Sequence, residues 1–465
     1  MEAYQLSALD ASSLIRSHDL SPVELTESVL ARIDAVDDLV GAFVTVTADR
    51  AREQAPRAEE EIAAGRYRGP LHGLTYGMKD LVDTAGIPTT SSSRTRAGHV
   101  PEADAAVVQR LDNAGAVMVG KTHTHEFAFG VITPTTRNPW NLEHIPGGSS
   151  GGSGAALAAG LCHLAIGTDT GGSIRIPSAV CGVTGLKPTY GRVSRRGVAS
   201  LSWSLDHVGP MARTVADVAA MLQALAGYDR TDPATCDVPV PDYSAHLGDG
   251  VAGLRIGLPT NYYVDHIDPA VDGAVRHLAQ RLADAGAEIV DVTIPRPEVY
   301  MPVEYAYFLA EASAYHQQRI REQAEDFEED VRVLLEVGEL LPATDYIRAM
   351  RVRTLLQQDW RDMFATGLDV VLAPTVPNVA ARVGQTTFDE HGVSEAIIDS
   401  YVRTSAPGNL TGLPALSVPC GFKDGLPIGA QIIGRPFDEV TVLRAGAVAE
   451  ATYEHAGAMP ELSSA

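Results

Sequence analysis

Apolar and polar positions along this chain alternate with two different periods. Residues 105–122 (AAVVQRLDNAGAVMVGKT) begin with apolar residues at helical spacing and continue after Gly115 as the short apolar run AVMVG. Residues 274–295 (AVRHLAQRLADAGAEIVDVTIP) repeat this change of period. Both stretches predict a helix followed by a buried strand. Further apolar runs of strand length lie at residues 367–375, 413–420 and 428–434. The pattern therefore predicts an α/β protein built on a buried sheet.

Local signals mark the start of one helix and the end of one strand. Ser21 is placed to cap a helix over residues 22–36, because Pro22 suits the first helical position and Glu24 completes a capping box. The apolar run LTYGMK predicts a strand that ends at Lys79. Such a strand would bury the lysine amine.

The organisation of the chain is that of one domain over residues 1–465. Residues 296–360 have helical periodicity over most of their length, and we expect a helical region there that walls a pocket. The chain has no fixed-period repeat and no low-complexity tract. The candidate linkers are short, as at residues 228–244, so we predict no second domain.

Composition and charge exclude several classes of function. The 465 residues are 45% hydrophobic and 20% charged, which is typical of a globular protein with a large core. With 59 acidic and 36 basic residues the formal net charge is −23, which repels nucleic-acid phosphates and anionic lipid headgroups. No apolar run approaches the roughly 20 residues that span a bilayer, and the N-terminus lacks the pattern of a signal peptide. We therefore expect no nucleic-acid partner, no membrane association and a cytoplasmic location.

The cysteines agree with a reducing compartment. They are far apart in sequence and include no C-x-x-C pair, which is typical neither of a disulfide framework nor of a zinc site. The four positions are Cys162, Cys181, Cys236 and Cys420.

Two stretches rich in glycine and serine carry the candidate chemistry. They are PGGSSGGSGAALAAGLC at residues 146–162 and DTGGSIR at residues 169–175. The first leads into an alanine-rich helix, whose free N-terminal N–H groups favour an anion. It lacks the lysine of a phosphate loop, and Leu157 stands where a dinucleotide fingerprint needs a glycine.

After the phosphate loop and the dinucleotide fingerprint, a nucleophile elbow is the third possible interpretation of residues 146–162. GGSSG and GSSGG both match G-x-S-x-G, but that elbow requires a strand directly before the serine. The preceding residues RNPWNLEHIPGG contain prolines and asparagines that break strands. The local context therefore disfavours an elbow.

The two Gly-Ser loops and Lys79 together could supply a nucleophile and its base. A serine hydroxyl is a poor nucleophile until a base accepts its proton. A lysine can be that base only when burial or like charge lowers its pKa from about 10.4. A second serine between the two can relay the proton. The candidate hydroxyls are those of Ser149, Ser150 and Ser173.

In order, the strings MKD, GGSSGG, DTGGSIR and CGVTGLKPTYGRVSRRGV resemble the amidase signature family of Ser/Ser/Lys amide hydrolases. The likeness extends from about residue 21 to GNLTGLPALSVPCGF and LPIGAQIIGRP near the C-terminus. It implies an α/β fold in which helices cover both faces of a large mixed β-sheet. It also implies a signature core at about residues 65–220 and a helical substrate-pocket region at about residues 296–360.

The resemblance assigns a role to each residue of the triad. Ser173 is the expected nucleophile, and Lys79 is the expected general base. Ser149 is the expected bridging serine, which in the family lies on a cis peptide bond. Four backbone N–H groups are expected to form the oxyanion hole, those of Thr170, Gly171, Gly172 and Ser173.

Four residues near the triad are candidates for substrate binding: Ser150, Phe127, Asp169 and Arg175. Asp169 and Arg175 flank the nucleophile loop, where hydrogen bonds could equally fix its shape. Phe127 lies on a segment that borders the substrate channel in the family, although aromatic residues more often belong to the core. His123 and His125 are the best metal pair, but the family has variable residues before a similar EFA string. We therefore expect no metal ion and no organic cofactor.

The implied activity is hydrolysis of a carboxylic amide, or of an aryl amide, ester or carbamate, through an acyl-enzyme at Ser173. The implied partner is a small amide-type substrate, and a homodimer is the commonest assembly for such a chain.

Two alternatives stay open. The A-type polypeptide of the tRNA-dependent amidotransferase shares both Gly-Ser loops, but it has a string similar to GTFALSAGYYDAYY where this chain has LLEVGELLPATDYIRAMRVR, residues 334–353. The other alternative is a non-catalytic binding protein on the same fold, since a fold does not guarantee chemistry. Lys79, Ser149 and Ser173 are all present, which counts against it.

Overall fold

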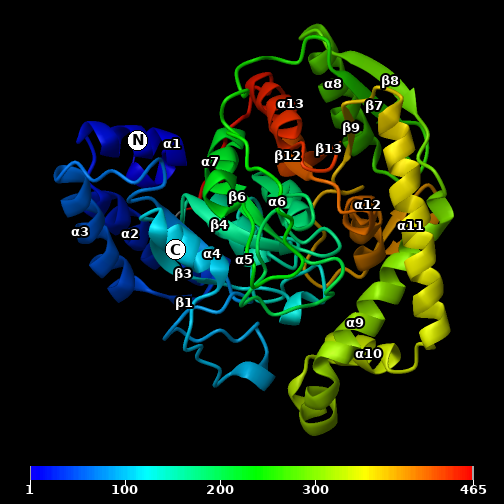
Figure 1. Cartoon of the computed structure of the whole chain (residues 1–465), viewed down its shortest axis with the longest axis horizontal. Helices are drawn as coiled ribbons and strands as arrows, with labels where there is room; N and C mark the ends of the chain where they lie inside the picture. The colour runs from blue at the N-terminus through cyan, green and yellow to red at the C-terminus, as the bar shows by residue number, and fades with distance from the viewer. Residues whose placement is uncertain (1, 463–465) are drawn as a thin grey trace.

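The computed structural model describes residues 2–462 and places eleven strands in one sheet (Figure 1). Across the sheet their order is β1 (Phe43–Val46), β3 (Val117–Thr122), β2 (Thr75–Lys79), β4 (Leu164–Asp169), β6 (His207–Ala212), β5 (Thr184–Lys187), β12 (Ala415–Lys423), β13 (Leu426–Gly434), β9 (Val370–Pro374), β7 (Arg255–Pro259) and β8 (Glu288–Val292). β2 is parallel to β3 and β4, and β7 is parallel to β8 and β9, while the other pairs are antiparallel. The expected mixed sheet is confirmed. A separate hairpin joins β10 (Thr387–Glu390) to β11 (Val393–Ala396).

The elements predicted from periodicity are present. α4 (Ala106–Asn113) precedes β3, and α8 (Pro269–Asp284) precedes β8. α2 (Pro22–Val40) begins after Ser21, whose hydroxyl accepts hydrogen bonds from the N–H groups of Val23 and Glu24. The Glu24 carboxylate accepts one from the Ser21 N–H, which completes the predicted capping box.

Helices cover both faces of the sheet because successive strand residues point to opposite sides. In β9, Val371 and Ala373 belong to one core, and Val370 and Leu372 belong to the other. The first core includes residues of α5 (Gly151–Ala158), α6 (Arg175–Cys181) and α12 (Ile397–Thr411). The second includes residues of α1 (Ala8–Ser17), α4, α7 (Val215–Leu225), α8 and α13 (Glu439–Ala451). α2 and α3 (Ala48–Ala63) contact β3 near one edge of the sheet.

The region expected to be helical lies on the side of the molecule away from α1 and α3 (Figure 1). It consists of α9 (Tyr300–Gln323), α10 (Glu329–Gly338) and α11 (Ala343–Ala365). α9 contacts α10, α11 and α12, so it connects this region to the sheet domain. Short 3-10 helices complete the fold at η1 (Ala3–Gln5), η2 (Arg94–Arg96), η3 (Glu126–Ala128), η4 (Pro297–Val299) and η5 (Ala324–Asp326).

No helix within residues 2–462 combines the length and the apolar character that crossing a membrane requires. All four cysteines are free thiols, and Cys162, Cys181 and Cys420 are buried.

Candidate active site

The parallel pairing of β2 with β4 brings Lys79 next to Thr168. Met78 is in register with Ile166, so both strands end at the same edge of the sheet. Thr168 Oγ1 lies 2.7 Å from Lys79 Nζ as a result. The Lys79 side chain is fully buried, as the apolar run before it predicted.

The N-terminus of α5 supplies two more hydroxyl groups to the same amine. Lys79 Nζ lies 2.7 Å from Ser149 Oγ and 2.8 Å from Ser150 Oγ. Both serines are fully buried, and the peptide bond between Gly148 and Ser149 is cis. The structure thus brings three of the residues named from the sequence, Lys79, Ser149 and Ser150, into direct contact.

The hydrogen-bond partners distinguish the two serines. A hydroxyl has one proton to donate, and Ser150 directs its own to the carbonyl of Thr168 at 3.2 Å. Ser150 Oγ also accepts from the Thr168 N–H at 3.2 Å. Ser149 Oγ has Lys79 Nζ as its hydrogen-bond partner among the described residues. Of the two serines, Ser149 is therefore the one whose proton can pass to the lysine.

Burial lowers the pKa of Lys79 well below its ordinary value, because the charged amine loses its hydration there. The carboxylates of Asp169 and Asp206 oppose this shift but do not cancel it. A neutral amine has a lone pair that can accept a proton. The environment therefore suits Lys79 to the role of a base.

The nucleophile loop between β4 and α6 depends on its two glycines. Gly172 has a φ of +116°, which side chains rarely adopt, and a Cβ there would lie 2.5 Å from Ser405 Oγ. A Cβ on Gly171 would lie 2.5 Å from Phe308 Cζ. Only glycine fits at either position without a shift of its neighbours.

Ser173 follows these glycines and is 5% exposed. Its carbonyl accepts a hydrogen bond from the Ser150 N–H at 3.2 Å, which joins the two Gly-Ser loops. With this small exposed fraction, the Ser173 side chain lies within reach of a molecule outside the loop. It is therefore available to a substrate.

The backbone donors expected for an oxyanion hole are not all free. The Gly172 N–H donates to Asp169 Oδ1 at 2.9 Å, so the expectation for this residue is not met in the structure. The carboxylate of Asp169 takes this donor because the loop folds directly over it. The N–H groups of Thr170, Gly171 and Ser173 are the remaining candidates.

Asp169 and Arg175 form a fully buried ion pair beneath the loop. Arg175 Nε lies 3.0 Å from Asp169 Oδ2, and Asn409 Nδ2 donates to Asp169 Oδ1 at 2.8 Å. Burial alone would raise the pKa of Asp169, but the Arg175 guanidinium holds it below its ordinary value. Neither side chain is accessible. This geometry favours a loop-ordering role for the pair over the expected contact with substrate.

A residue that sequence reasoning missed holds the start of the nucleophile loop. Thr170 Oγ1 donates to Asp206 Oδ1 at 2.7 Å. The Asp206 carboxylate also accepts from the Ser200 hydroxyl and from the N–H groups of Leu201 and Ser202. Asp206 therefore ties Thr170 to the loop that precedes β6.

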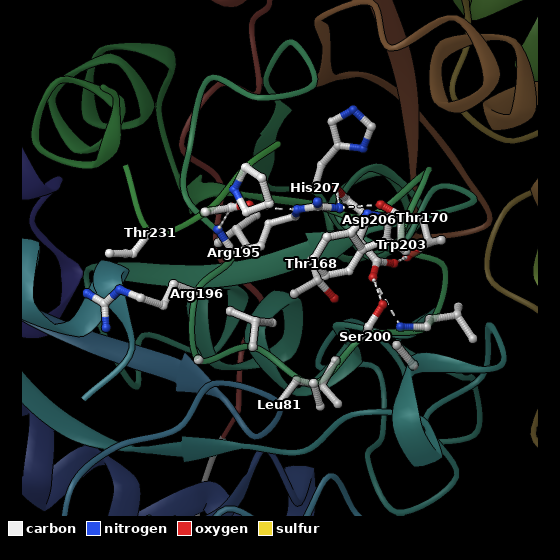
Figure 2. A pocket seen from close by; sticks show the side chains of 18 residues that line it. Leu81, Thr168, Thr170, Arg195, Arg196, Ser200, Trp203, Asp206, His207 and Thr231 are labelled. Carbon is white, nitrogen blue, oxygen red and sulfur yellow. Dashed lines mark hydrogen bonds and ion pairs between the residues drawn. The ribbon is translucent and has the colours of Figure 1, made fainter. Parts of the chain in front are cut away.

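A cavity of about 200 Å³ opens at this point and reaches both Thr168 and Thr170 (Figure 2). Apolar wall residues include Leu81, Ala128 and Leu201, and Trp203 lies at the same cavity. Since Thr168 contacts Lys79, this cavity adjoins the proposed proton-accepting group.

Phe127, expected at the substrate channel, belongs to an aromatic cluster instead. The centroid of its ring lies 4.2 Å from that of His316 and 5.8 Å from that of Phe327. Phe127 is 1% exposed. Phe129 lines a cavity of about 740 Å³ together with Tyr305 of α9. Of these two phenylalanines, Phe129 is the one that lines this cavity.

His123 and His125 have different surroundings. Burial lowers the pKa of His123, and His125 Nε2 lies 3.1 Å from Asp330 Oδ2. Across residues 2–462, no group of three or more His, Cys, Asp or Glu side chains is arranged to hold a metal ion.

Comparisons with known proteins identify the family of this chain. Residues 24–443 match the family described as Amidase. An amidase of Pseudomonas putida is 48% identical over 455 residues, which cover 97% of each chain. The A-type polypeptide of the glutamyl-tRNA(Gln) amidotransferase from Roseiflexus sp. (strain RS-1) is 43% identical over 489 aligned positions, 99% of each chain. The solved structure of a bacterial aryl acylamidase of the amidase signature family superimposes with a TM-score of 0.88 at 29% identity, over 96% of each chain. The chain belongs to the amidase family.

Proposed function

We propose that this protein hydrolyses a carboxylic amide to acid and amine through an acyl-enzyme formed at Ser173. The observation that carries the proposal is the fully buried Lys79 amine 2.7 Å from Ser149 Oγ, beside the loop that bears Ser173. Membership of the amidase family and the 48% identity to an amidase support the same reaction.

In this mechanism the Ser173 hydroxyl attacks the carbonyl carbon and passes its proton to Ser149, whose own proton passes to neutral Lys79. The N–H groups of Thr170, Gly171 and Ser173 stabilise the oxyanion. Lys79 then returns a proton through Ser149 to the departing amine. Water then attacks the resulting ester while its proton passes through Ser149 to Lys79, and the acid leaves as Lys79 returns that proton through Ser149 to Ser173.

The cavity of Figure 2 is our proposed pocket for the group next to the scissile carbonyl. It lies at Thr170 and has a largely apolar wall, which suits a small neutral acyl or aryl group. The larger cavity combines Gly130, Val131 and Ile132 with residues of α9 and α10, which belong to the helical region expected to wall a pocket. We propose that it forms the entrance for the rest of the molecule.

The free thiols also suit a cytoplasmic enzyme, and the continuous sheet suits a single domain over residues 1–465. The homodimer stays a prediction.

A second function, that of the A-type polypeptide of an amidotransferase, is favoured by the 43% identity to such a protein over 99% of each chain. It differs from the first in needing partner subunits for its reaction.

Release of amine from primary amides, anilides and carbamates, and of alcohol from esters, separates the two functions. We expect turnover by the wild-type chain alone and none by Ser173→Ala. Turnover by Ser173→Ala would contradict the acyl-enzyme. Turnover of glutamine that appears only after partner subunits are added would favour the amidotransferase.

A further inference from the structure

Glu304 on α9 is a fully buried carboxyl group that the proposed mechanism does not use. Neither of its carboxyl oxygens has a hydrogen-bond partner among residues 2–462. Buried polar groups are nearly always hydrogen-bonded, because an unpaired one loses its hydration without compensation. The position of Glu304 therefore calls for a functional explanation.

Glu304 lies against the nucleophile loop. Its Oε1 is 3.4 Å from the point that a Cβ on Gly171 would occupy. Phe308, four residues later and thus on the same face of α9, contacts the same glycine. Gly171 is two residues before Ser173, so their Cα atoms are at most about 7.6 Å apart. α9 thus brings one polar and one aromatic side chain close to the reacting centre.

Burial favours the uncharged form of the Glu304 carboxyl group. Burial raises the pKa of this carboxyl well above its ordinary value, and Arg353, Arg175 and Lys187 only partly oppose the shift. Arg175 is already paired with Asp169, whose negative charge raises the pKa of Glu304 further. Arg353 donates to the carbonyls of Leu410 and Ser204 at 2.8 and 3.0 Å. A neutral carboxyl presents one O–H donor beside one C=O acceptor.

A carboxamide presents the complementary pair, a C=O acceptor beside an N–H donor. We propose that Glu304 recognises a second carboxamide group of the substrate, close to the scissile carbonyl, through two hydrogen bonds of this kind. This inference rests on the proposed function and names the substrate class as small diamides.

Phe308 controls access to Glu304. Both carboxyl oxygens are shielded from solvent, so the Phe308 ring has to turn away from Gly171 before a substrate can reach them. The centroid of the Phe308 ring lies 6.3 Å from the ring centroids of Phe129 and Tyr305, and these two residues line the 740 Å³ cavity. That cavity gives the ring space to move.

Malonamide and 3-methylbutanamide test the proposal, because they have nearly the same shape and differ in the second carboxamide. The readout is the ratio of their kcat/KM values. We expect the wild type to prefer malonamide at least tenfold. Glu304→Gln should keep this preference, because a carboxamide side chain also has one donor and one acceptor. Glu304→Leu should lose it, because leucine has neither.

Melting temperature separates recognition from a structural role. Glu304→Leu removes an unpaired buried polar group. Its melting temperature should therefore be no lower than that of the wild type. Glu311 on the same helix is the matched control, because its carboxylate accepts from Ser202, Ser204 and Tyr346. Glu311→Gln should lower the melting temperature and keep the malonamide preference.

Three results would overturn the proposal. The first is a Glu304→Leu variant that still prefers malonamide. The second is loss of the preference together with a fall in melting temperature, which would indicate a structural carboxyl. The third combines two observations: both Glu304→Gln and Glu304→Leu lose the preference, and the wild type hydrolyses 3-aminopropanamide better than malonamide. This result would indicate that Glu304 is a carboxylate that binds a cation.

Binding keeps this test separate from the proposed function. Calorimetry with Ser173→Ala should show malonamide binding that is lost in Ser173→Ala/Glu304→Leu. If the wild type hydrolyses no amide while this difference in binding persists, the hydrolase proposal fails and the recognition by Glu304 stands. Equal binding by the two proteins would overturn the recognition.

Discussion

Lys79 Nζ lies 2.7 Å from Ser149 Oγ although 70 residues separate them in the sequence. The contact depends on two features of the fold. Parallel pairing places the end of β2 beside the end of β4, and α5 begins over that edge. A route for a proton from a hydroxyl to a buried amine is therefore a property of the whole sheet and not of one loop.

The two serines at the start of α5 should differ in importance. We expect Ser149→Ala to lower kcat by at least about a hundredfold, because a relay of proton transfer contributes about 10²- to 10⁴-fold. Ser150→Ala should have a smaller effect, because the Ser150 hydroxyl already donates to the Thr168 carbonyl. Steady-state kinetics of both variants checks this. Equal losses would contradict the assignment of the relay to Ser149.

Hydrolysis should increase with pH as Lys79 loses its proton. The base must be neutral, and burial lowers the pKa of Lys79 well below its ordinary value. kcat/KM should therefore decrease at pH values below that lowered pKa and reach a plateau above it. A pH profile of the wild type, measured where circular dichroism shows the protein folded, tests the sign. A decrease in activity with increasing pH over the same range would exclude a lysine base.

The buried pair of Asp169 and Arg175 should matter mainly for stability. Asp169→Asn leaves the Arg175 charge buried without its partner, which costs about 3–5 kcal/mol in the free energy of unfolding. The folded pKa of Asp169 is depressed, so its contribution is complete above the unfolded value of about 3.9 and is lost as the pH falls toward the folded value. Urea unfolding at pH 7 and at a pH below the unfolded value should show a smaller loss of stability on acidification in the variant than in the wild type.

Asp272→Asn is the matched control for that experiment. Asp272 forms a partly exposed pair with Arg276 at 2.8 Å on α8. Removal of such a pair changes stability by at most about 1 kcal/mol. An Asp169→Asn effect no larger than that of Asp272→Asn would contradict the role assigned to the buried pair.

The hydrogen bond from Thr170 to Asp206 should affect catalysis more than binding. Thr170→Val keeps the volume and removes the 2.7 Å contact that holds the start of the nucleophile loop. We expect kcat to fall about tenfold with little change in KM, because displaced oxyanion donors stabilise the transition state less. A rise in KM with unchanged kcat would assign Thr170 to substrate binding instead.

Local sequence signals predicted the elements that carry the triad. The apolar run before Lys79 predicted β2, and the alanine-rich stretch after Ser150 predicted α5. Both predictions held because each depends on neighbours a few residues away. Periodicity also predicted the helices between residues 296 and 360.

Contacts between distant segments could not be predicted in this way. Asp206 reaches Thr170 from 36 residues away, and Glu304 meets Gly171 from a different helical region. Thr168 had a usable signal, since it is the last residue but one of β4, which is parallel to the strand that ends at Lys79. The Gly172 N–H was assigned to the oxyanion hole because the sequence gives no indication that Asp169 folds under the loop to accept it.

Trapping of the acyl group by hydroxylamine tests the acyl-enzyme most directly. Wild type and Ser173→Ala are each incubated with malonamide or 3-methylbutanamide and hydroxylamine, and the corresponding hydroxamic acid is measured. An acyl-enzyme at Ser173 predicts hydroxamate from the wild type and none above background from Ser173→Ala, with both proteins folded. Hydroxamate from Ser173→Ala at the wild-type rate would show that the acyl group is carried elsewhere.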